Sequence, residues 1–571
     1  MPLSTMMRRR FLHSCLMGWL LLVVGCQPHA FQSPFGPSRA RFAEAIREPL
    51  HRLDEKGALL AVRVVDVETG QEWYAENPDT PMIPASNGKL AISAAALDLF
   101  GPAHTFKTYL VLDPAKDDLW LIGTGDPGCG DERIARKYGR NTLSILDDFT
   151  AALKRRGRTE IRGNLYYWDR AFDEEWVHPN WRKDFLVDWY AAPVSGLNFN
   201  DNCIDVTAIP GEDGTPAELE VIPPNTIATI RNETVSFGDD PVEILREPDA
   251  PVFTVRGGVK DRVKLESKPI TNPGMFFADA LRTHLRENGI RILGQIQRAE
   301  SLPFGPAGPP NDRILATHET SIVDVLWRVN KNSQNLFAEA LSKAMGREMM
   351  FRRGQSVPGS WKLGEEATAG FLWSNRINAG SFVAADGSGL ARENRVTARL
   401  ITDLLVLMYR HPHGRLWRDS LAVAGVDGTL ARRLKDIEGR VLAKTGYIGG
   451  VRSLSGYVHT RQGRWLAFCM IYNEIDGSVK PYEQLQDDAC RVMYYWPGKV
   501  IYPPREAPDA ATQPAAGPAT QASTETPTTQ PTGETPATQP ADAESITPAR
   551  TAPAAGLSGT GFCVPLAGGH M

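Results

Sequence analysis

The stretch Pro84-Ala85-Ser86-Asn87-Gly88-Lys89 runs directly into Leu90-Ala91-Ile92-Ser93-Ala94-Ala95-Ala96-Leu97-Asp98-Leu99-Phe100. The second segment is apolar on nearly every side and stops at Gly101-Pro102, as a fully buried helix would. Ser86 and Lys89 stand three residues apart at its start, so they share one helix face. An S-x-x-K string occurs by chance in most proteins of this size, as a capped helix start with a solvated lysine. Here a solvated face is hard to find, so the stretch predicts a buried amine beside a hydroxyl.

Two more short strings follow along the chain, Ser333-Gln334-Asn335 and Lys444-Thr445-Gly446. Each is weak evidence alone. Together with the S-x-x-K string, and in this order, they resemble the signature of penicillin-binding proteins and serine β-lactamases. The long interval between the first two strings is typical of the D-alanyl-D-alanine carboxypeptidase/endopeptidase group, the class C low-molecular-mass penicillin-binding proteins, whereas compact β-lactamases have a short one.

Longer strings also resemble that group. They are Leu121-Ile122-Gly123-Thr124-Gly125-Asp126-Pro127, Tyr190-Ala191-Ala192-Pro193-Val194-Ser195-Gly196-Leu197-Asn198, Ser333-Gln334-Asn335-Leu336-Phe337-Ala338-Glu339, Asp386-Gly387-Ser388-Gly389-Leu390 and Ala424-Gly425-Val426-Asp427-Gly428-Thr429-Leu430. The resemblance runs from about residue 41 to residue 495 and excludes the C-terminal tail.

Strand patterns lie at both ends of this region. Alternating and apolar runs predict strands at 58–67, 71–74, 440–444, 451–458 and 465–472, and helical spacing predicts helices at 41–53 and 482–495. Strands from both ends can therefore join one antiparallel sheet flanked by helices. The predicted fold class is α/β (α+β), and the resemblance implies a penicillin-binding-protein/β-lactamase-like transpeptidase domain with a large strand-rich insertion.

Composition shifts suggest where the parts begin and end. Residues 103–310 are rich in Pro, Gly and Asn, with short alternating runs, and a proline-rich linker closes them at 303–310. Most residues between 511 and 550 are Ala, Pro, Thr or Gln, which cannot bury enough surface to fold. The expected organisation is a signal peptide at 1–26, a linker at 27–40, a discontinuous peptidase domain at 41–102 and 311–500, mostly β inserted domains at 103–310 and a disordered tail at 501–571.

A serine hydroxyl becomes a good nucleophile only when a neighbouring base takes its proton. A lysine can act as that base when burial and nearby positive charge keep its amine neutral. The apolar helix would supply burial, and Lys444 and the positive helix N-terminus would supply like charge. The sequence therefore predicts Ser86 as the nucleophile and Lys89 as the general base.

The resemblance implies roles for the other motif residues. Ser333 would relay a proton to the leaving group, and Asn335 would hydrogen-bond Lys89 and the substrate amide. Lys444 and Thr445 would lie on an edge strand and bind the terminal carboxylate of the substrate.

Two further positions of the third motif matter. Gly446 would let the substrate backbone approach closely, and the backbone N–H groups of Ser86 and Tyr447 would form the oxyanion hole. Position 447 is usually threonine in this family, so the tyrosine puts carboxylate binding, rather than acylation, in doubt.

The resemblance implies a serine-type D-Ala-D-Ala carboxypeptidase or endopeptidase that acts on peptidoglycan stem peptides and is inhibited covalently by β-lactam antibiotics. One alternative is a β-lactamase or esterase of the same fold. Another is a non-catalytic wall-binding lipoprotein, which would be expected to have lost a motif residue.

The composition excludes several other classes of protein. With 63 Lys+Arg against 67 Asp+Glu, the chain lacks the basic excess of a nucleic-acid-binding protein, and 7 cysteines are too few for a disulfide scaffold. No H-E-x-x-H, P-loop or dinucleotide-binding string is present, so neither a cofactor nor a metal is expected. His411-Pro412-His413 lacks a third ligand nearby and is interpreted as surface.

The N-terminus reads as an export signal. Arg8-Arg9-Arg10 precedes an apolar run too short to span a bilayer, and Val23-Val24-Gly25-Cys26 resembles the lipobox of bacterial lipoproteins. Sec and Tat export both stay open. The protein is therefore expected in the periplasm or cell envelope, attached to a membrane only through a lipid on Cys26.

Two remaining features have structural interpretations. Asp386-Gly387-Ser388-Gly389 predicts a tight loop that shapes the pocket, in preference to a second nucleophile. Cys129, Cys203, Cys469 and Cys490 leave a disulfide pairing open, and Cys469, in an apolar strand, predicts a core position.

Overall fold

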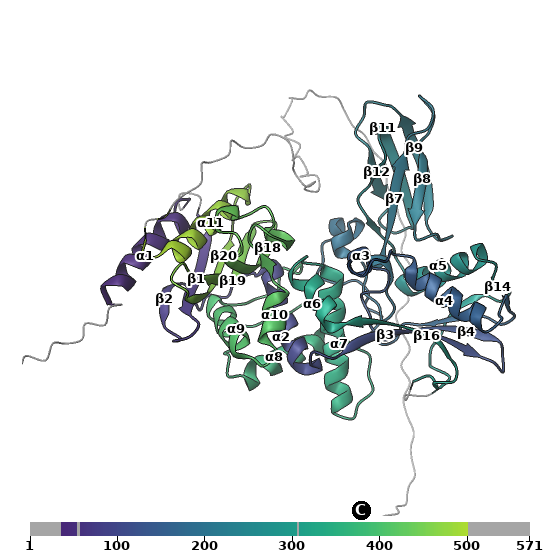
Figure 1. Ribbon diagram of the computed structural model, residues 1–571, viewed down its shortest axis with the longest axis horizontal. Coiled ribbons are helices and arrows are strands. Elements are labelled where there is room, and N and C mark those ends of the chain that lie inside the picture. Colours follow the sequence, from purple (N-terminus) through teal and green to yellow (C-terminus); the bar gives the residue numbers. More distant parts are fainter. Residues whose placement is uncertain (1–35, 54–56, 305–307, 499, 501–571) are drawn as a thin grey trace, which may run out of the picture. The chain divides into compact units, whose positions relative to one another are not determined.

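A six-stranded antiparallel sheet gathers strands from both ends of the folded region (Figure 1). The structure is a computed structural model that describes residues 36–53, 57–304, 308–498 and 500. The predicted signal peptide with Cys26, most of the predicted linker and the predicted tail lie outside the described residues. The strand order is β17 (Ala422–Val423), β18 (Val441–Ile448), β19 (Val451–His459), β20 (Trp465–Asn473), β1 (Leu59–Asp66) and β2 (Glu72–Glu76).

Alternation along these strands builds a core on each face of the sheet. In β20, Phe468 and Met470 pack with the terminal helices, whereas Cys469 and Ile471 pack with the helical layer on the other face. Cys469 is fully buried, which confirms its predicted core position. The terminal helices are α1 (Gly36–Leu50) and α11 (Lys480–Tyr495), and the opposite layer contains α2 (Lys89–Phe100), α6 (Ile322–Asn330), α7 (Asn335–Arg352), α8 (Trp361–Ser374), α9 (Ala398–Arg410) and α10 (Gly414–Asp419).

Helix α2 lies in the middle of its layer. Every residue from Lys89 to Leu97 is buried, as the all-round apolar sequence predicts. Its neighbours include α6, α7, α8 and α9. Because the helix is enclosed by others, a side chain at its first residue is held away from water.

Two expected elements end at different places in the structure. The strand predicted at 440–444 continues to Ile448 as β18, because its pairing with β19 extends to the Ile448–Val451 pair at the Gly449-Gly450 turn. The helix expected at 41–53 spans Gly36–Leu50 instead.

A five-stranded mixed sheet combines four strands of the predicted insertion with β16, which follows it. Its order is β15 (Ile296–Arg298), β6 (Leu165–Trp168), β4 (Asp118–Gly123), β3 (Thr105–Asp113) and β16 (Ile314–Ser321). β3 enters from α2 and β16 returns to α6, and the two pair antiparallel from Thr105–Ser321 onward. Three helices accompany this sheet, α3 (Glu132–Lys137), α4 (Ser144–Arg155) and α5 (Pro273–Glu287), and a two-stranded pair joins β5 (Glu160–Ile161) to β14 (Arg291–Ile292).

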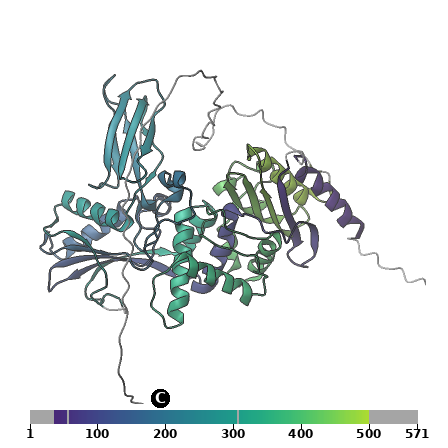
Figure 2. The ribbon, with the colours of Figure 1, turned by 180° about the vertical axis from the view of Figure 1, so that it is seen from behind.

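Residues 203–269 form further strands, which Figure 2 shows from behind. β7 (Cys203–Ile209) pairs with β8 (Glu218–Ile222), β12 (Val263–Lys264) and β13 (Lys268–Pro269). A separate three-stranded sheet contains β10 (Glu243–Arg246), β11 (Val252–Val259) and β9 (Thr229–Ser236). None of the helices in the described part of the chain is both long and apolar enough to cross a bilayer.

Candidate active site

Ser86 and Lys89 lie at the junction between a short 3₁₀ turn (Ala85–Gly88) and α2. The turn begins with Ala85 at φ +48°, a conformation that non-glycine residues rarely adopt and that is concentrated at functional sites. Lys89 Nζ lies 2.9 Å from Ser86 Oγ. The predicted pairing of amine and hydroxyl is therefore present in the structure.

The other contacts of Lys89 determine how its amine is oriented. Nζ donates to Asn335 Oδ1 at 2.7 Å and to the carbonyl oxygen of Ser388 at 2.6 Å. The Asn335 amide nitrogen donates to the carbonyl of Tyr190 at 2.7 Å, which fixes the amide orientation. A neutral amine has two N–H groups and one lone pair. Because both N–H groups have acceptors, the lone pair is left for the Ser86 hydroxyl.

Burial controls the protonation of this amine. Lys89 is fully buried, and this loss of hydration lowers the pKa of its ammonium to about 7. The carboxylates of Glu339 and Asp386 act in the opposite direction, because negative charge favours the ammonium form. Near neutral pH a substantial fraction of Lys89 is therefore uncharged.

Ser333 and Asn335 flank the start of α7. Ser333 has φ +61°, so the link between α6 and α7 turns sharply at the serine. Asn335 is the first residue of α7, and the side chain of Gln334 accepts from its backbone N–H. The Gln334 amide also donates to Asp201 Oδ2 at 2.6 Å, so a residue of the insertion helps to hold this turn.

Lys444 connects the second and third motifs. Its Nζ donates to Ser333 Oγ at 2.7 Å and to the carbonyl of Thr445 at 2.8 Å. Burial, followed by the charge on Lys89, lowers the pKa of Lys444 well below its ordinary value. The repulsion between the two amines therefore lowers the pKa of Lys444, whereas the lowered pKa of Lys89 comes from burial and not from the charge on Lys444.

The rest of the third motif follows on β18. Thr445 is partly exposed, and its hydroxyl bonds that of Thr429 at 2.8 Å. A Cβ at Gly446 would lie 2.1 Å from Ser453 Oγ and 3.1 Å from the backbone nitrogen of Ser86, so only glycine fits there. Tyr447 is 54% exposed, and the Arg452 guanidinium lies 5.6 Å from its ring centroid.

A buried carboxylate supports the site from behind. Glu339, four residues after Asn335 on α7, accepts from the backbone N–H groups of Gly387 and Ser388 at 2.7 and 2.9 Å. It also accepts from Trp361 Nε1 at 2.7 Å. These bonds fix the carbonyl of Ser388 that receives Lys89 Nζ. Sequence reasoning quoted this glutamate within a longer string and gave it no role.

Asp386 holds the same loop in a tight turn. Its carboxylate accepts from the backbone of Gly389 and Ala391, from the amide of Asn394 and from Trp181 Nε1 of the insertion. The side chain of Ser388 is buried. The predicted pocket-shaping loop fits these contacts. What the sequence did not reveal is that the insertion supplies part of the wall, through Trp181 and the carbonyl of Tyr190.

The remaining candidates lie apart from this cluster. His411 Nε2 lies 3.2 Å from Asp98 Oδ1, and neither His411 nor His413 belongs to a potential metal-binding group among the described residues. The four cysteines that the structure describes, Cys129, Cys203, Cys469 and Cys490, are free thiols.

Comparison with known proteins shows where the chain belongs. The model of the D-Ala-D-Ala carboxypeptidase 3 (S13) family matches residues 42–491. The D-alanyl-D-alanine carboxypeptidase of Actinomadura sp. (strain R39) is 32% identical over 476 residues, which cover 77% of this chain and 83% of the relative. The D-alanyl-D-alanine carboxypeptidase DacB of Haemophilus influenzae is 25% identical over 417 residues, 70% of this chain and 81% of the relative.

The fold comparison agrees with the sequence comparison. The crystal structure of penicillin binding protein 4 (dacB) from Haemophilus influenzae superposes with a TM-score of 0.64, at 22% identity, over 79% of this chain and 99% of that chain. The predicted fold class, family and enzyme class are confirmed. The chain belongs to the D-Ala-D-Ala carboxypeptidase 3 (S13) family.

Proposed function

We propose that the protein is a serine-type D-alanyl-D-alanine carboxypeptidase/endopeptidase that acts on peptidoglycan stem peptides through an acyl-enzyme on Ser86. The observation that carries this proposal is the 2.9 Å contact between Ser86 Oγ and the buried amine of Lys89. The match to the S13 family supports the substrate class.

In the acylation step, neutral Lys89 accepts the proton of the Ser86 hydroxyl. The oxygen attacks the carbonyl carbon of the penultimate D-alanine, and the backbone N–H groups of Ser86 and Tyr447 stabilise the oxyanion. Ser333 then passes a proton to the leaving amine as the peptide bond breaks. The contact between Ser333 Oγ and Lys444 Nζ supports this relay, because it places a proton donor next to the serine.

The residues beside the nucleophile bind the substrate. Lys444 and the Thr445 hydroxyl bind the terminal carboxylate, and Asn335 binds the amide next to the scissile bond. Gly446 keeps β18 close to the backbone of Ser86, because a side chain there would meet Ser453, Pro84 and Ser86. Deacylation follows when water attacks the ester carbonyl and releases Ser86.

Covalent labelling tests the nucleophile. Fluorescent penicillin should label the wild-type protein, and Ser86→Ala should abolish labelling, because among the described residues Ser86 supplies the hydroxyl that is hydrogen-bonded to Lys89 Nζ. Labelling that persisted in this variant would place the nucleophile elsewhere.

Product analysis tests the reaction. Release of D-alanine from a synthetic pentapeptide indicates carboxypeptidase activity, and cleavage of cross-linked muropeptides indicates endopeptidase activity. Fast hydrolysis of penicillin without action on either peptide would favour a β-lactamase, and no turnover of any of them would favour a wall-binding protein.

The export signal adds a proposal about location. The protein acts outside the cytoplasm, in the periplasm or cell envelope, attached to a membrane through a lipid on Cys26. The lipobox-like string at residues 23–26 supports this. Cys26→Ala should move the protein from the detergent phase to the soluble fraction, whereas Cys203→Ser should leave it in the detergent phase.

A further inference from the structure

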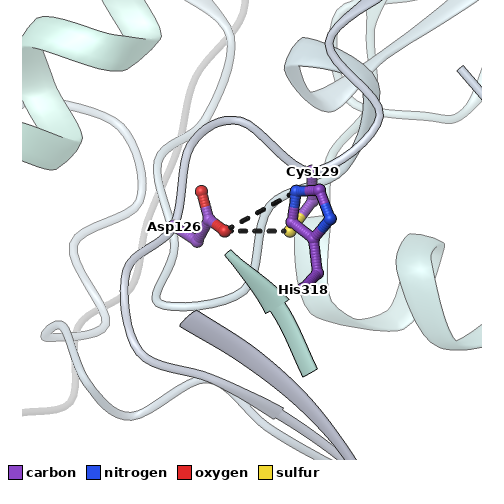
Figure 3. Close-up of side chains that lie close together, drawn as sticks. All are labelled: Asp126, Cys129 and His318. Atoms are coloured by element: carbon purple, nitrogen blue, oxygen red, sulfur yellow. Dashed lines mark hydrogen bonds and ion pairs between the residues drawn. The ribbon is translucent and has the colours of Figure 1, made fainter. Parts of the chain in front are cut away.

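Three potential metal ligands meet at one end of the five-stranded sheet, and none of them belongs to the three motifs of the active site. Asp126 and Cys129 come from the loop that follows β4, and His318 comes from β16 (Figure 3). The three ligand atoms lie within 4.8 Å of one another. Among the described residues, this is the one place where three or more His, Cys, Asp or Glu side chains come close enough to hold a metal ion.

Strand pairing brings the histidine to the loop. His318 on β16 is the cross-strand partner of Thr108 on β3, so the two side chains stand next to each other on one face. The Thr108 hydroxyl lies 3.1 Å from Cys129 Sγ. The loop is pressed against this face, because a Cβ at Gly128 would lie 2.4 Å from Thr320 Oγ1.

The ligand atoms are close enough to share one ion, although the thiol donates to the carboxylate in its absence. Asp126 Oδ2 lies 3.5 Å from Cys129 Sγ and 3.9 Å from His318 Nε2. A direct bond between imidazole and carboxylate would be about 2.7–3.2 Å long. Ligands of one tetrahedral zinc ion stand about 3.3–3.6 Å apart. The Asp126–Cys129 separation already matches, and the His318 imidazole would move a few tenths of an ångström toward the ion.

Burial gives the cluster a reason to hold a cation. The side chains of Asp126 and Cys129 are fully buried, and His318 is 23% exposed. Asp126 Oδ1 accepts from the backbone N–H of Gly128 at 2.8 Å, and Oδ2 faces the Cys129 thiol and the His318 imidazole. The Thr320 hydroxyl also bonds the carboxylate and lies 3.4 Å from His318 Nε2, so these neutral partners satisfy hydrogen bonds but bring no positive charge. A buried carboxylate without a full counter-charge is costly, and a divalent cation supplies that charge.

We propose that Asp126, Cys129 and His318 bind one divalent ion of the zinc class. A sulfur ligand together with imidazole and carboxylate selects zinc or cobalt over calcium and magnesium, which prefer oxygen. Binding breaks the S–H bond of Cys129 and releases its proton to solvent, and no electron is transferred. The partly exposed edge of His318 is where a water molecule reaches the fourth position.

The ion would tie the loop to the sheet. Asp131, five residues beyond Asp126, caps α3 and pairs with Arg328 of α6, the helix that precedes Ser333. Binding therefore fixes a loop between the insertion and the peptidase domain, and it does not touch the reacting groups. The sequence predicts no metal, because it has no H-E-x-x-H string and His411 and His413 lack a third ligand nearby. The cluster found here joins Asp126 and Cys129 to His318, which lies far along the chain.

Cobalt titration tests the site. The full chain, with any affinity tag removed, is stripped with a chelator, and then loaded with Co²⁺ or Zn²⁺ and dialysed. We expect one ion per chain by mass spectrometry and a thiolate-to-cobalt charge-transfer band. Cys129→Ser should remove the band, and His318→Gln should weaken zinc binding more than about 100-fold, since even indirect partners of metal ligands contribute 10–100-fold.

Two matched variants serve as controls. Cys203→Ser removes another buried thiol and His411→Gln another histidine, and both should keep the band and the stoichiometry. His318 is partly exposed, so His318→Gln should fold, as circular dichroism and penicillin labelling would verify. A stripped protein that takes up no ion, a cobalt complex without the thiolate band, or a stoichiometry unchanged in Cys129→Ser and His318→Gln would each overturn the proposal.

Discussion

Lys89 is a residue on which two physical demands conflict. A base must be uncharged to accept a proton, yet an amine in water is protonated at neutral pH. Complete burial resolves the conflict by favouring the neutral amine, which then loses its hydrogen bonds to water. The carbonyl of Ser388 and the side-chain amide of Asn335 replace those bonds by accepting from its two N–H groups. The same contacts that make the amine tolerable also aim its lone pair at Ser86.

The pH profile of acylation should report this amine. Because Lys89 is active when neutral and burial lowers its pKa to about 7, the second-order rate of penicillin acylation should rise with pH below about 7 and level off above it. Stopped-flow measurement with a chromogenic β-lactam would check it. Lys89→Ala should lower the rate about 10²- to 10⁴-fold with the fold intact. A few-fold loss would mean that another group is the base.

Glu339 should act on that profile through Lys89. Its carboxylate favours the ammonium form, and burial raises its own pKa to about 7, so the two groups titrate as a pair. Glu339→Gln should move the rising limb to lower pH, because that negative charge is gone. It should also lower the plateau, because an amide cannot accept all three hydrogen bonds of the carboxylate.

A matched variant separates this effect from a general one. Glu348 lies on the same helix, α7, and pairs with Arg352 at the surface. Glu348→Gln should leave the pH profile of acylation where it is in the wild type. An unshifted profile in Glu339→Gln would show that Glu339 has no influence on the protonation of Lys89.

At the scale of single residues, the sequence predicted contacts between catalytic side chains that are close together in the chain. Ser86 and Lys89 are neighbours on one helical turn, so their contact follows from the chain itself. Glu339 and the carbonyl of Ser388 meet across a long interval, and one of the two is a backbone atom. A contact with a backbone atom does not depend on residue type, so this contact could not be predicted from the sequence and is known only from the structure.

Helices and strands were predictable where burial produces a regular pattern of apolar residues along the sequence. β19 and β20 have the expected positions because alternate residues enter different cores. Helix α2 was predicted from its apolar composition alone. The turn between α6 and α7 was not predictable, because its shape depends on Asp201 and Arg328, which belong to different parts of the chain.

Arg328 should be a major stabiliser of that turn. The guanidinium is 5% exposed and pairs with Asp131, which is 1% exposed, and with Asp201. Arg328→Ala leaves the buried Asp131 carboxylate without its guanidinium partner and removes a contact of Asp201, so the free energy of unfolding should fall by about 3–5 kcal/mol. Penicillin acylation should slow as well, since Asp201 also binds Gln334 beside Ser333.

An exposed pair provides the comparison. Arg231 is 55% exposed and pairs with Glu247 on the surface of the insertion. Arg231→Ala should cost less than about 1 kcal/mol, because water screens such a pair. Urea unfolding of both variants would check the contrast, and equal losses would contradict the assignment of a structural role to the buried pair.

At the scale of the whole molecule, the chain forms its central sheet from strands separated by the insertion. The sequence predicted that strands from both ends would join, because each end carried its own alternating runs. It could not predict that the insertion reaches back to the site through Trp181 and Tyr190, since such contacts depend on tertiary packing. The domain boundaries at 102–103 and 310–311 stay a prediction, and β16, which pairs with β3, begins after the second of them.

The insertion should divide into a part that acylation needs and a part that it does not. Ala208 of β7 pairs with Val263 of β12, so replacing residues 210–261 by Asn-Gly would join Ile209 to Arg262 through a two-residue hairpin turn. This variant should react with fluorescent penicillin at a rate close to that of the full chain. Its insertion should lose at least about 3–5 kcal/mol of stability, because the buried side chain of Phe253 is removed from the core.

Trp181→Ala is the opposite variant, since it keeps those strands and removes the indole that donates to Asp386. Because Asp386 organises the loop that carries the Ser388 carbonyl, we expect slower acylation in Trp181→Ala than in the shortened chain. Labelling kinetics at one penicillin concentration would compare the two. If the shortened chain failed to label while remaining folded by circular dichroism, residues 210–261 would have to contribute to the active site, and the division of the insertion would be wrong.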